Sequence, residues 1–269
     1  MLGQELAKTF KENSPFLWDR NEIDISNQEE VHKKIAGLKP DLVINAAAYN
    51  DVDGAEKNEA IANQINGYAV GYLAKAINAI GGILVHYSTD YVFKGDKKQG
   101  YLEADIPDPQ SAYAKSKYLG EQEIINNIKK FYLIRLSRLF GQSAKSVQAK
   151  KSFVDIMIEL SKTKKKLNVV NEELSSPTYA PDLARQTKYI IDDKLPFGIY
   201  HVTNRGACTW AEFAKAIFAI KNLSVTINPV KSSFFPRPAV RPNYSQLINS
   251  KLPDSRNWQE ALNEYLDGI

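Results

Sequence analysis

The sequence predicts an α/β protein, a doubly wound parallel sheet with a smaller C-terminal lobe. Short apolar runs rich in β-branched residues alternate with segments of helical periodicity, the order typical of a parallel sheet with helices on both faces. The chain has 269 residues, 43% of them hydrophobic and 25% charged, so it can bury the core that such a fold requires.

Six apolar runs are expected to form the strands. They cover residues 15–18, 41–46, 83–88, 131–136, 167–170 and 199–202. Each run is short and is followed by a turn or by a helical pattern, as is typical of buried strands in a parallel sheet.

Helices are expected between these strands, because apolar residues recur there at spacings of three and four. They lie near residues 28–37, 55–80, 111–128, 151–162, 180–191 and 209–220. A last helix carries Trp258, Leu262 and Leu266 on one face and closes the chain.

Three residues in the middle of the chain have proton-transfer chemistry. Tyr113 and Lys117 are four residues apart in a predicted helix, so the ammonium can lie beside the phenol on one face. A nearby ammonium favours phenolate, so we expect the pKa of Tyr113 to fall from ~10 toward working pH. Thr89 follows the strand 83–88, at a carboxyl end where ligands bind in open α/β sheets. A hydroxyl there can hold a carbonyl oxygen while Tyr113 protonates it, which indicates carbonyl reduction by a nicotinamide cofactor.

Small residues after the strand 41–46 are expected to line a nucleotide site. They are Ala46, Ala47 and Ala48. Small side chains let a ligand approach the backbone closely over the strand ends. The alternative is simple helix-to-sheet packing, which also favours alanine.

Two charged residues, Asp19 and Arg20, follow the predicted strand 15–18. An acidic residue at this place binds a ribose hydroxyl, and a basic one accommodates a 2′-phosphate. Because both are present, the choice between NAD and NADP stays open.

Composition argues against several other classes of protein. The net charge of +4 is spread through short clusters such as residues 162–166, without interleaved aromatic residues, so no nucleic-acid partner is expected. A lone Cys208 rules out an internal disulfide and is expected to be buried. No N-terminal apolar stretch is long enough for a signal or membrane helix, so we expect a cytoplasmic protein without membrane contact. His32, His86 and His201 are isolated in the sequence, and no metal site is expected.

Taken together, these residues resemble the extended short-chain dehydrogenase/reductases and, within them, the dTDP-4-dehydrorhamnose reductase family. The most specific match is the run Ser-Thr-Asp-Tyr-Val-Phe at residues 88–93. Further matching runs are residues 43–49, 113–121, 176–180, 198–201, 209–214 and 241–247. The resemblance therefore extends over nearly the whole chain.

The resemblance implies a Rossmann-like fold and reduction of the C4 ketone of dTDP-4-dehydro-L-rhamnose to dTDP-L-rhamnose. NADPH is the expected cofactor and NADH is possible. Tyr113 would supply the proton, Lys117 would also hold the nicotinamide ribose, and Thr89 would position the carbonyl. Further expected cofactor-side residues are Leu2, Asp24, Ile25 and Asn66. Expected substrate-side residues are Thr89, Asp90, Tyr91 and Arg241, whose guanidinium matches phosphate geometry.

The same resemblance implies how the chain is divided. Residues 1–142 and 180–204 would form the dinucleotide-binding domain, and residues 143–179 and 205–269 the sugar-nucleotide lobe. Some members of the family associate as dimers, so a homodimer is possible.

Two departures from the family pattern are expected to matter. The chain begins at Met1-Leu2-Gly3, which matches only the tail of the family's glycine-rich loop, so the first strand is expected to be missing and its neighbours to have unpaired edges. Restoring that strand should raise the melting temperature. Arg138 stands where the family usually has an aromatic residue, which would favour a more polar or charged sugar group.

Other functions stay open at this stage. Some proteins of this fold bind NADP as regulatory subunits, for example of methionine adenosyltransferase, without established turnover. Another sugar-nucleotide reductase or an epimerase of the same superfamily is a further alternative. Thr89 also has a purely structural alternative, in which it only satisfies a strand end.

Overall fold

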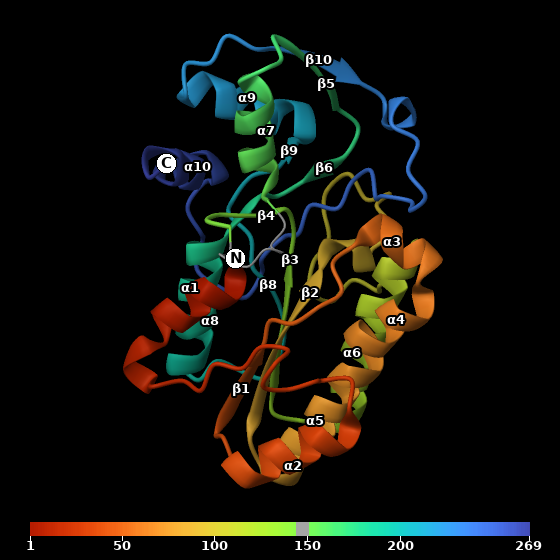
Figure 1. The fold of residues 1–269 in the computed structure, drawn as a ribbon, viewed down its shortest axis with the longest axis vertical. Helices are drawn as coiled ribbons and strands as arrows, with labels where there is room; N and C mark the ends of the chain where they lie inside the picture. The colour runs from red at the N-terminus through yellow and green to blue at the C-terminus, as the bar shows by residue number, and fades with distance from the viewer. Residues whose placement is uncertain (144–150) are drawn as a thin grey trace.

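The structure is a computed structural model that describes residues 1–143 and 151–269. Its main sheet has four parallel strands in the order β1-β2-β3-β8. These strands are β1 (Leu42–Asn45), β2 (Ile83–Thr89), β3 (Phe131–Leu136) and β8 (Gly198–His201). All four run the same way, so their carboxyl ends meet at one edge of the sheet, as Figure 1 shows.

Helices cover both faces of this sheet (Figure 1). One face carries α2 (Gln28–Leu38), α5 (Ala69–Ala79) and α6 (Ala112–Asn127), and the other carries α1 (Leu2–Thr9) and α8 (Ala180–Asp192). Successive residues of a strand point to opposite faces. Leu84 and Leu133 therefore join the first apolar core, and Val85 and Ile134 join the second. The predicted doubly wound fold is confirmed.

A third apolar core lies in the upper part of Figure 1. It is built on α7 (Phe153–Ser161), α9 (Trp210–Ile220), α10 (Trp258–Asp267) and a two-stranded parallel sheet of β5 (Lys166–Val170) and β10 (Thr226–Val230). Two short strand pairs lie below it: β4 (Leu139–Phe140) with β7 (Thr178–Tyr179), and β6 (Leu174–Ser175) with β9 (Cys208–Thr209). The exact domain boundaries given above stay a prediction.

The remaining elements are single turns near the sheet's carboxyl edge and in the connecting loops. They are the 3-10 turns η1 (Lys11–Asn13), η3 (Asp90–Val92) and η4 (Ser232–Phe234), the short helices α3 (Val52–Lys57) and α4 (Glu59–Asn63), and the π-helical turn η2 (Gln64–Tyr68).

One predicted strand is wrong. Residues 15–18 form no strand, and Phe16 and Leu17 expose 74% and 65% of their surface. A strand satisfies its backbone by pairing with a neighbour, and among the described residues β1 pairs only with β2. Residues 15–18 join none of the described strands, and the other edge of β1 stays unpaired.

The long helix predicted at 55–80 is divided into α3, α4, η2 and α5. Within this stretch α6 and η2 approach each other closely: a Cβ on Gly120 would lie 2.1 Å from the carbonyl oxygen of Asn66. A π-helical turn accommodates such local packing at the expense of regular helix geometry. The other predicted helices are confirmed within a few residues at each end.

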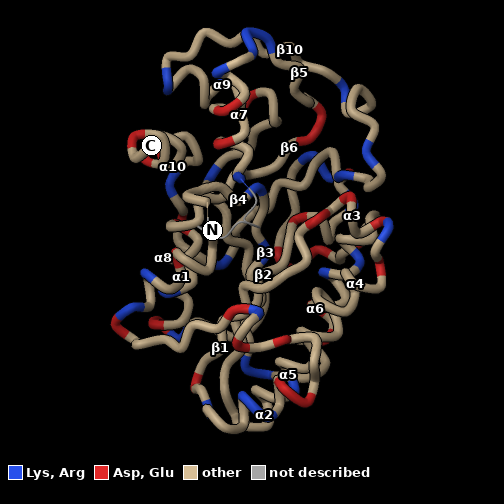
Figure 2. The backbone as a smooth tube through the Cα atoms, in the orientation of Figure 1, with Lys and Arg blue, Asp and Glu red and all other residues tan. Residues whose placement is uncertain are grey.

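Charged residues are distributed over both parts of the molecule, as Figure 2 shows, without one continuous basic face in that view. Inside the described residues, no helix combines the length and the apolar character needed to cross a bilayer. Cys208 is buried and carries no disulfide, as predicted.

Candidate active site

The site begins where β2 ends. Thr89, its last residue, is 8% exposed, and its hydroxyl caps the turn that follows by accepting from the amide of Tyr91 at 3.2 Å. The same hydroxyl donates to Asp90 Oδ1 at 3.1 Å and lies close enough to the phenol of Tyr113 to lower its pKa. The structure thus brings the predicted Thr89 and Tyr113 together.

The position of Tyr113 is fixed by two caps on the first turn of α6. The Ser111 hydroxyl accepts from the amide of Ala114 at 3.2 Å, and the carboxylate of Glu56 in α3 accepts from the amide of Ala112 at 2.8 Å. Such caps satisfy amides that have no partner within the helix. No sequence motif marks Glu56 as a site residue. Only the fold shows that its carboxylate caps the helix that carries Tyr113.

Lys117 lies one turn further along α6 and is 3% exposed. Its Nζ donates to the carbonyl oxygen of Tyr87 at 2.7 Å and lies 3.3 Å from His86 Nε2. Burial lowers the pKa of Lys117 to about 8, and burial together with Lys117 holds the pKa of His86 well below its usual value. The His86 ring is therefore neutral at pH 7 and can accept a hydrogen bond from the ammonium.

The expected lowering of the Tyr113 pKa is wrong for this arrangement. Burial and the Asp90 charge raise the pKa of Tyr113 to about 12, and the Thr89 hydrogen bond opposes them only in part. Lys117 is directed toward Tyr87 and His86 and does not lower it. The phenol therefore stays protonated across the physiological range, which is the form that a proton donor needs.

Asp90 is a buried carboxylate that ties the sheet to the C-terminal chain. Its Oδ2 accepts from the hydroxyls of Ser175 at 3.0 Å and Ser245 at 2.6 Å, and its side chain is 3% exposed. Burial raises its pKa to about 6, although these hydroxyls and Arg138 favour the charged form. The sequence placed Asp90 against the substrate, whereas the structure shows both of its oxygens occupied by protein hydroxyls.

Tyr91 links the reacting phenol to a group of charged side chains. Its ring meets the Tyr113 ring edge-on, with 6.1 Å between centroids. The charges of Glu173, Arg241 and Arg138 all act on its phenol, whose pKa is raised chiefly by burial. Tyr91 therefore contacts the ring of the proton donor and feels the charge of Arg241, the predicted phosphate-binding residue.

Arg241 is paired inside the protein. Its Nη1 and Nη2 donate to the two carboxylate oxygens of Asp53 in α3, at 2.9 and 2.6 Å.

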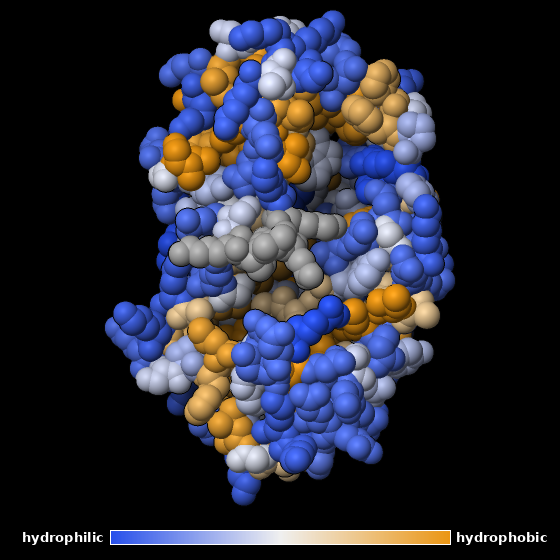
Figure 3. All heavy atoms as spheres, viewed as in Figure 1, coloured by the Kyte–Doolittle hydropathy of each residue, from blue (hydrophilic) through white to orange (hydrophobic). Residues whose placement is uncertain are grey.

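Arg241 belongs to residues 232–243, a segment that we call the strap. A surface pocket of about 320 Å³ is lined mainly by the strap, including Arg237 and Arg241, together with Glu173. Figure 3 shows that the surface is hollowed between the lower, sheet-containing part and the upper part of the molecule.

The predicted cofactor residues divide into exposed and buried ones. Ala46 and Ala47 are exposed at the carboxyl end of β1, and Ala48 is half-buried, so small side chains do border open space there. Asn66 is fully buried instead, and its amide accepts from the backbone N–H of Tyr49 at 2.8 Å and donates to the Tyr49 carbonyl at 3.0 Å. Asn66 therefore fixes the loop that bears the alanines, and its cofactor role stays a prediction.

The predicted cofactor residues near the N-terminus are distant from Tyr113 in the sequence. Their side chains contact neighbouring residues of the same region or the apolar cores. Asp19 and Asp24 accept from the backbone amides two residues further on, and Arg20 is exposed. Leu2 and Ile25 are partly buried and pack against the cores on opposite faces of the sheet. Their cofactor roles stay predictions.

Arg138, which the sequence singles out, is held by neighbours that the sequence did not reveal. The Arg138 guanidinium lies 4.0 Å from the ring of Trp210 and donates to the carbonyl oxygens of Cys208 and Glu173, each at 2.6 Å. Trp210 Nε1 in turn donates to the Glu173 carboxylate at 2.8 Å, and Arg237 of the strap forms an ion pair with it. Arg138 is thus held by two backbone carbonyls and by Trp210, and its expected effect on the choice of sugar stays a prediction.

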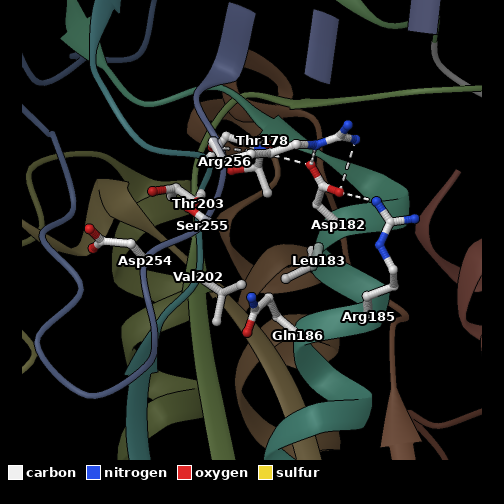
Figure 4. Close-up of a pocket in the computed structure, with 11 residues that line it drawn as sticks. Thr178, Asp182, Leu183, Arg185, Gln186, Val202, Thr203, Asp254, Ser255 and Arg256 are labelled. Carbon is white, nitrogen blue, oxygen red and sulfur yellow. Dashed lines mark hydrogen bonds and ion pairs between the residues drawn. The ribbon is translucent and has the colours of Figure 1, made fainter. Parts of the chain in front are cut away.

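A second pocket, of about 120 Å³, lies beside α8 and contains none of the predicted site residues (Figure 4). Its charged groups neutralise one another, because the carboxylate of Asp182 accepts from both Arg256 and Arg185. In residues 1–143 and 151–269, no group of three His, Cys, Asp or Glu side chains is placed to hold a metal ion.

Comparison with known proteins places the chain in a family. The sequence model described as the RmlD substrate binding domain matches residues 1–269. The chain belongs to the RmlD family. Among curated RmlD-like sequences, it is 37% identical to the spore coat polysaccharide biosynthesis protein SpsK of Bacillus subtilis, over 98% of this chain and 93% of the relative.

Two solved structures extend the RmlD comparison. A dTDP-4-dehydrorhamnose reductase from Clostridium acetobutylicum superposes with a TM-score of 0.94 at 38% identity, covering 99% of this chain and 95% of that one. The dTDP-4-dehydrorhamnose reductase of Bacillus anthracis, solved in complex with NADP, gives a TM-score of 0.91 at 34% identity, over 98% and 95%. These names favour the reductase interpretation over a nucleotide-binding regulatory subunit.

Proposed function

We propose that this protein reduces the C4 ketone of dTDP-4-dehydro-L-rhamnose to dTDP-L-rhamnose with NADPH. The observation that carries the proposal is that Thr89, at the carboxyl end of β2, lies close enough to the Tyr113 phenol of α6 to lower its pKa, with Lys117 one turn further along α6. Membership of the RmlD family and the reductases among its relatives support the dTDP-sugar substrate.

The residues at the sheet edge suit a nicotinamide nucleotide. Exposed Ala46 and Ala47 leave the carboxyl end of β1 accessible, where a nucleotide lies in open α/β sheets. The Lys117 ammonium has three hydrogens, of which Tyr87 and His86 account for two, so it retains one for a ribose hydroxyl. When bound, the nicotinamide supplies the hydride to the ketone carbon. NADP is favoured by the Bacillus anthracis complex, and Arg20 is available for a 2′-phosphate.

The protein's own groups manage the proton. To hold the substrate, the Thr89 hydroxyl turns its one hydrogen from Asp90 Oδ1 to the ketone oxygen and so orients that oxygen toward the phenol. Tyr113, protonated because its pKa is about 12, transfers its proton to that oxygen as negative charge develops there. Solvent then returns a proton to the phenolate, while Lys117, held at the Tyr87 carbonyl and His86, is placed to bind the cofactor ribose.

Oxidation of NADPH in the presence of dTDP-4-dehydro-L-rhamnose, followed by nicotinamide absorbance, tests the proposal. Tyr113→Phe keeps the ring and its packing but removes the proton donor, so we expect kcat to fall by about 10²–10⁴-fold with NADPH affinity retained. NADH serves as the second cofactor, and a lower kcat/KM with NADH is expected. If wild-type protein consumes neither cofactor with this sugar, the proposed reaction is wrong.

A further inference from the structure

The pairing of Asp53 with Arg241 joins two parts of the molecule that are distant in the sequence. Asp53 is the second residue of α3, beside the sheet, and Arg241 lies near the end of the strap. Two parallel N–H to oxygen contacts connect them, and the Asp53 carboxylate also accepts from the amide of Ala239 at 3.2 Å. The Arg241 side chain is 12% exposed and the Asp53 side chain 37%, so the pair is open to solvent on the Asp53 side.

This pair lies at a defined place relative to the reacting groups. Arg241 acts electrostatically on Tyr91, and the Tyr91 ring contacts that of Tyr113. Asp53 belongs to α3, whose Val52 and Ala55 pack in the same small apolar cluster as Tyr113. Both residues of the pair are thus linked to the surroundings of Tyr113, and we take the pair to be within reach of the diphosphate of a sugar nucleotide whose ketone meets Tyr113.

The geometry of the pair is that of phosphate recognition. A guanidinium binds carboxylate and phosphate through the same two-pronged contact, so the two oxygens of Asp53 take the positions that two phosphate oxygens would need. A diphosphate and Asp53 cannot both use this fork. Arg237, the other arginine of the strap, is held by Glu173 and keeps the strap attached when the Asp53 contact opens.

We propose that Asp53 occupies the diphosphate subsite of the ligand-free protein as an internal competitor, and that the sugar nucleotide binds by displacing Asp53 from Arg241. This inference rests on the proposed function for the identity of the ligand as a nucleoside-diphosphate sugar. When Asp53 is displaced, the strap loses its contact with α3. Ligand binding is thereby coupled to a movement of the strap away from α3.

A different role for Asp53 would change nucleotide affinity in the opposite direction when its charge is removed. If Asp53 only orients Arg241 for a ligand that binds to the intact pair, removing its charge weakens nucleotide binding. If Asp53 competes with the ligand, removing its charge strengthens binding. Asp53→Asn separates the two, because asparagine keeps the size and one acceptor oxygen for the Ala239 amide while losing the negative charge.

The test is isothermal titration calorimetry of the full chain with dTDP. We expect Asp53→Asn to bind dTDP about two- to tenfold more tightly than wild type, the range that a half-exposed ion pair can supply. Glu59→Gln removes one negative charge from the exposed start of the neighbouring helix α4 and should leave the affinity within about twofold. In Arg241→Gln the affinity should fall, and adding Asp53→Asn to that variant should bring no gain.

Equal or weaker dTDP binding by Asp53→Asn overturns the proposal, as does the absence of dTDP binding in every variant. If Asp53→Asn does not fold, as judged from its melting curve, Asp53→Ser is titrated instead with the same expected direction. The readout needs no turnover. Tighter binding in the variant together with no NADPH oxidation would refute the proposed reaction and leave the competition intact.

Discussion

Asp90 has the most consequential single charge in the site. It is buried, it accepts three hydroxyl hydrogen bonds, and its negative charge raises the pKa of Tyr113. The three contacts join the end of β2, the short strand β6 and the C-terminal chain at Ser245. Through these contacts Asp90 sets both the acidity of the proton donor and the position of the hydroxyl beside it, so we regard it as a positioning residue.

The raised pKa of Asp90 makes stability depend on pH in a predictable direction. The folded state keeps the Asp90 proton up to about pH 6, whereas the unfolded chain loses it near pH 4, so this group's contribution to stability falls as pH rises from 4 to 6. We expect the unfolding free energy of Asp90→Asn, relative to wild type, to rise by about 2–3 kcal/mol between pH 4 and pH 7. Urea unfolding at both pH values measures it.

Asp96→Asn provides the contrasting control. Asp96 is exposed, and hydrogen bonds from Tyr101 and Lys94 lower its pKa, so its contribution to stability is lost as pH falls. Its variant should therefore become less stable relative to wild type as pH rises, opposite to Asp90→Asn. A difference between Asp90→Asn and wild type that does not change with pH would contradict the raised pKa.

At the level of elements, the π-helical turn η2 organises the cofactor edge. Asn66 lies in this turn, where Gly120 of α6 comes so close that no side chain could replace its hydrogen. The amide of Asn66 bonds both backbone groups of Tyr49 and donates to the Ser116 hydroxyl at 3.0 Å. One side chain thereby joins the loop after β1 to the helix that carries Tyr113.

We predict that Asn66→Ala loosens this loop. Loss of three hydrogen bonds leaves polar groups without partners, which should reduce the unfolding free energy by about 2–4 kcal/mol. NADPH affinity should fall as well, because the exposed alanines are no longer held at the sheet edge. Urea unfolding and NADPH fluorescence titration measure the two effects. Asn78→Ala, an exposed position in α5, is the matched control, and an Asn66→Ala protein as stable as this control would refute the role.

The sequence predicts the helices and strands whose patterns are local. It does not predict which apolar runs find a neighbouring strand to pair with. The strand at 83–88 and the helix at 111–128 are visible as an apolar run and a helical period, and their junction predicts the contact of Thr89 with Tyr113. The run at 15–18 has the same local signal, yet it forms no strand because pairing is a property of the assembled sheet.

The same distinction holds within the site. The spacing of Tyr113 and Lys117 correctly places both on α6, but it does not reveal that Lys117 is directed to Tyr87 and His86. The pair of Asp53 and Arg241 joins residues 188 positions apart, and nothing in the sequence near either residue indicates the other. Contacts of this kind follow from topology, and they decide the electrostatics of the site.

For the molecule as a whole, the important feature is that polar ties connect the sheet to the C-terminal chain. Glu103 accepts from the Ser250 hydroxyl at 2.7 Å, and Tyr101 exchanges backbone hydrogen bonds with Gln246 and Ile248. Together with Asp90, they bind residues 245–250 across the sheet's carboxyl end. The sheet and the third core are therefore expected to unfold together, because separating them would expose these buried groups.

We predict a single thermal transition that NADPH moves as a whole. At a free cofactor concentration of about 100 times Kd, binding stabilises the folded state by about 2.7 kcal/mol, which corresponds to a rise in Tm of roughly 5–10 °C for a chain of this size. Calorimetry with and without NADPH measures the shift, and fluorescence transfer from protein to nicotinamide gives Kd separately. Two transitions, of which only one responds to NADPH, would show that the polar ties do not couple the parts. In that case the displacement of Asp53 would have to act within the strap alone, because no connection would carry it to the sheet.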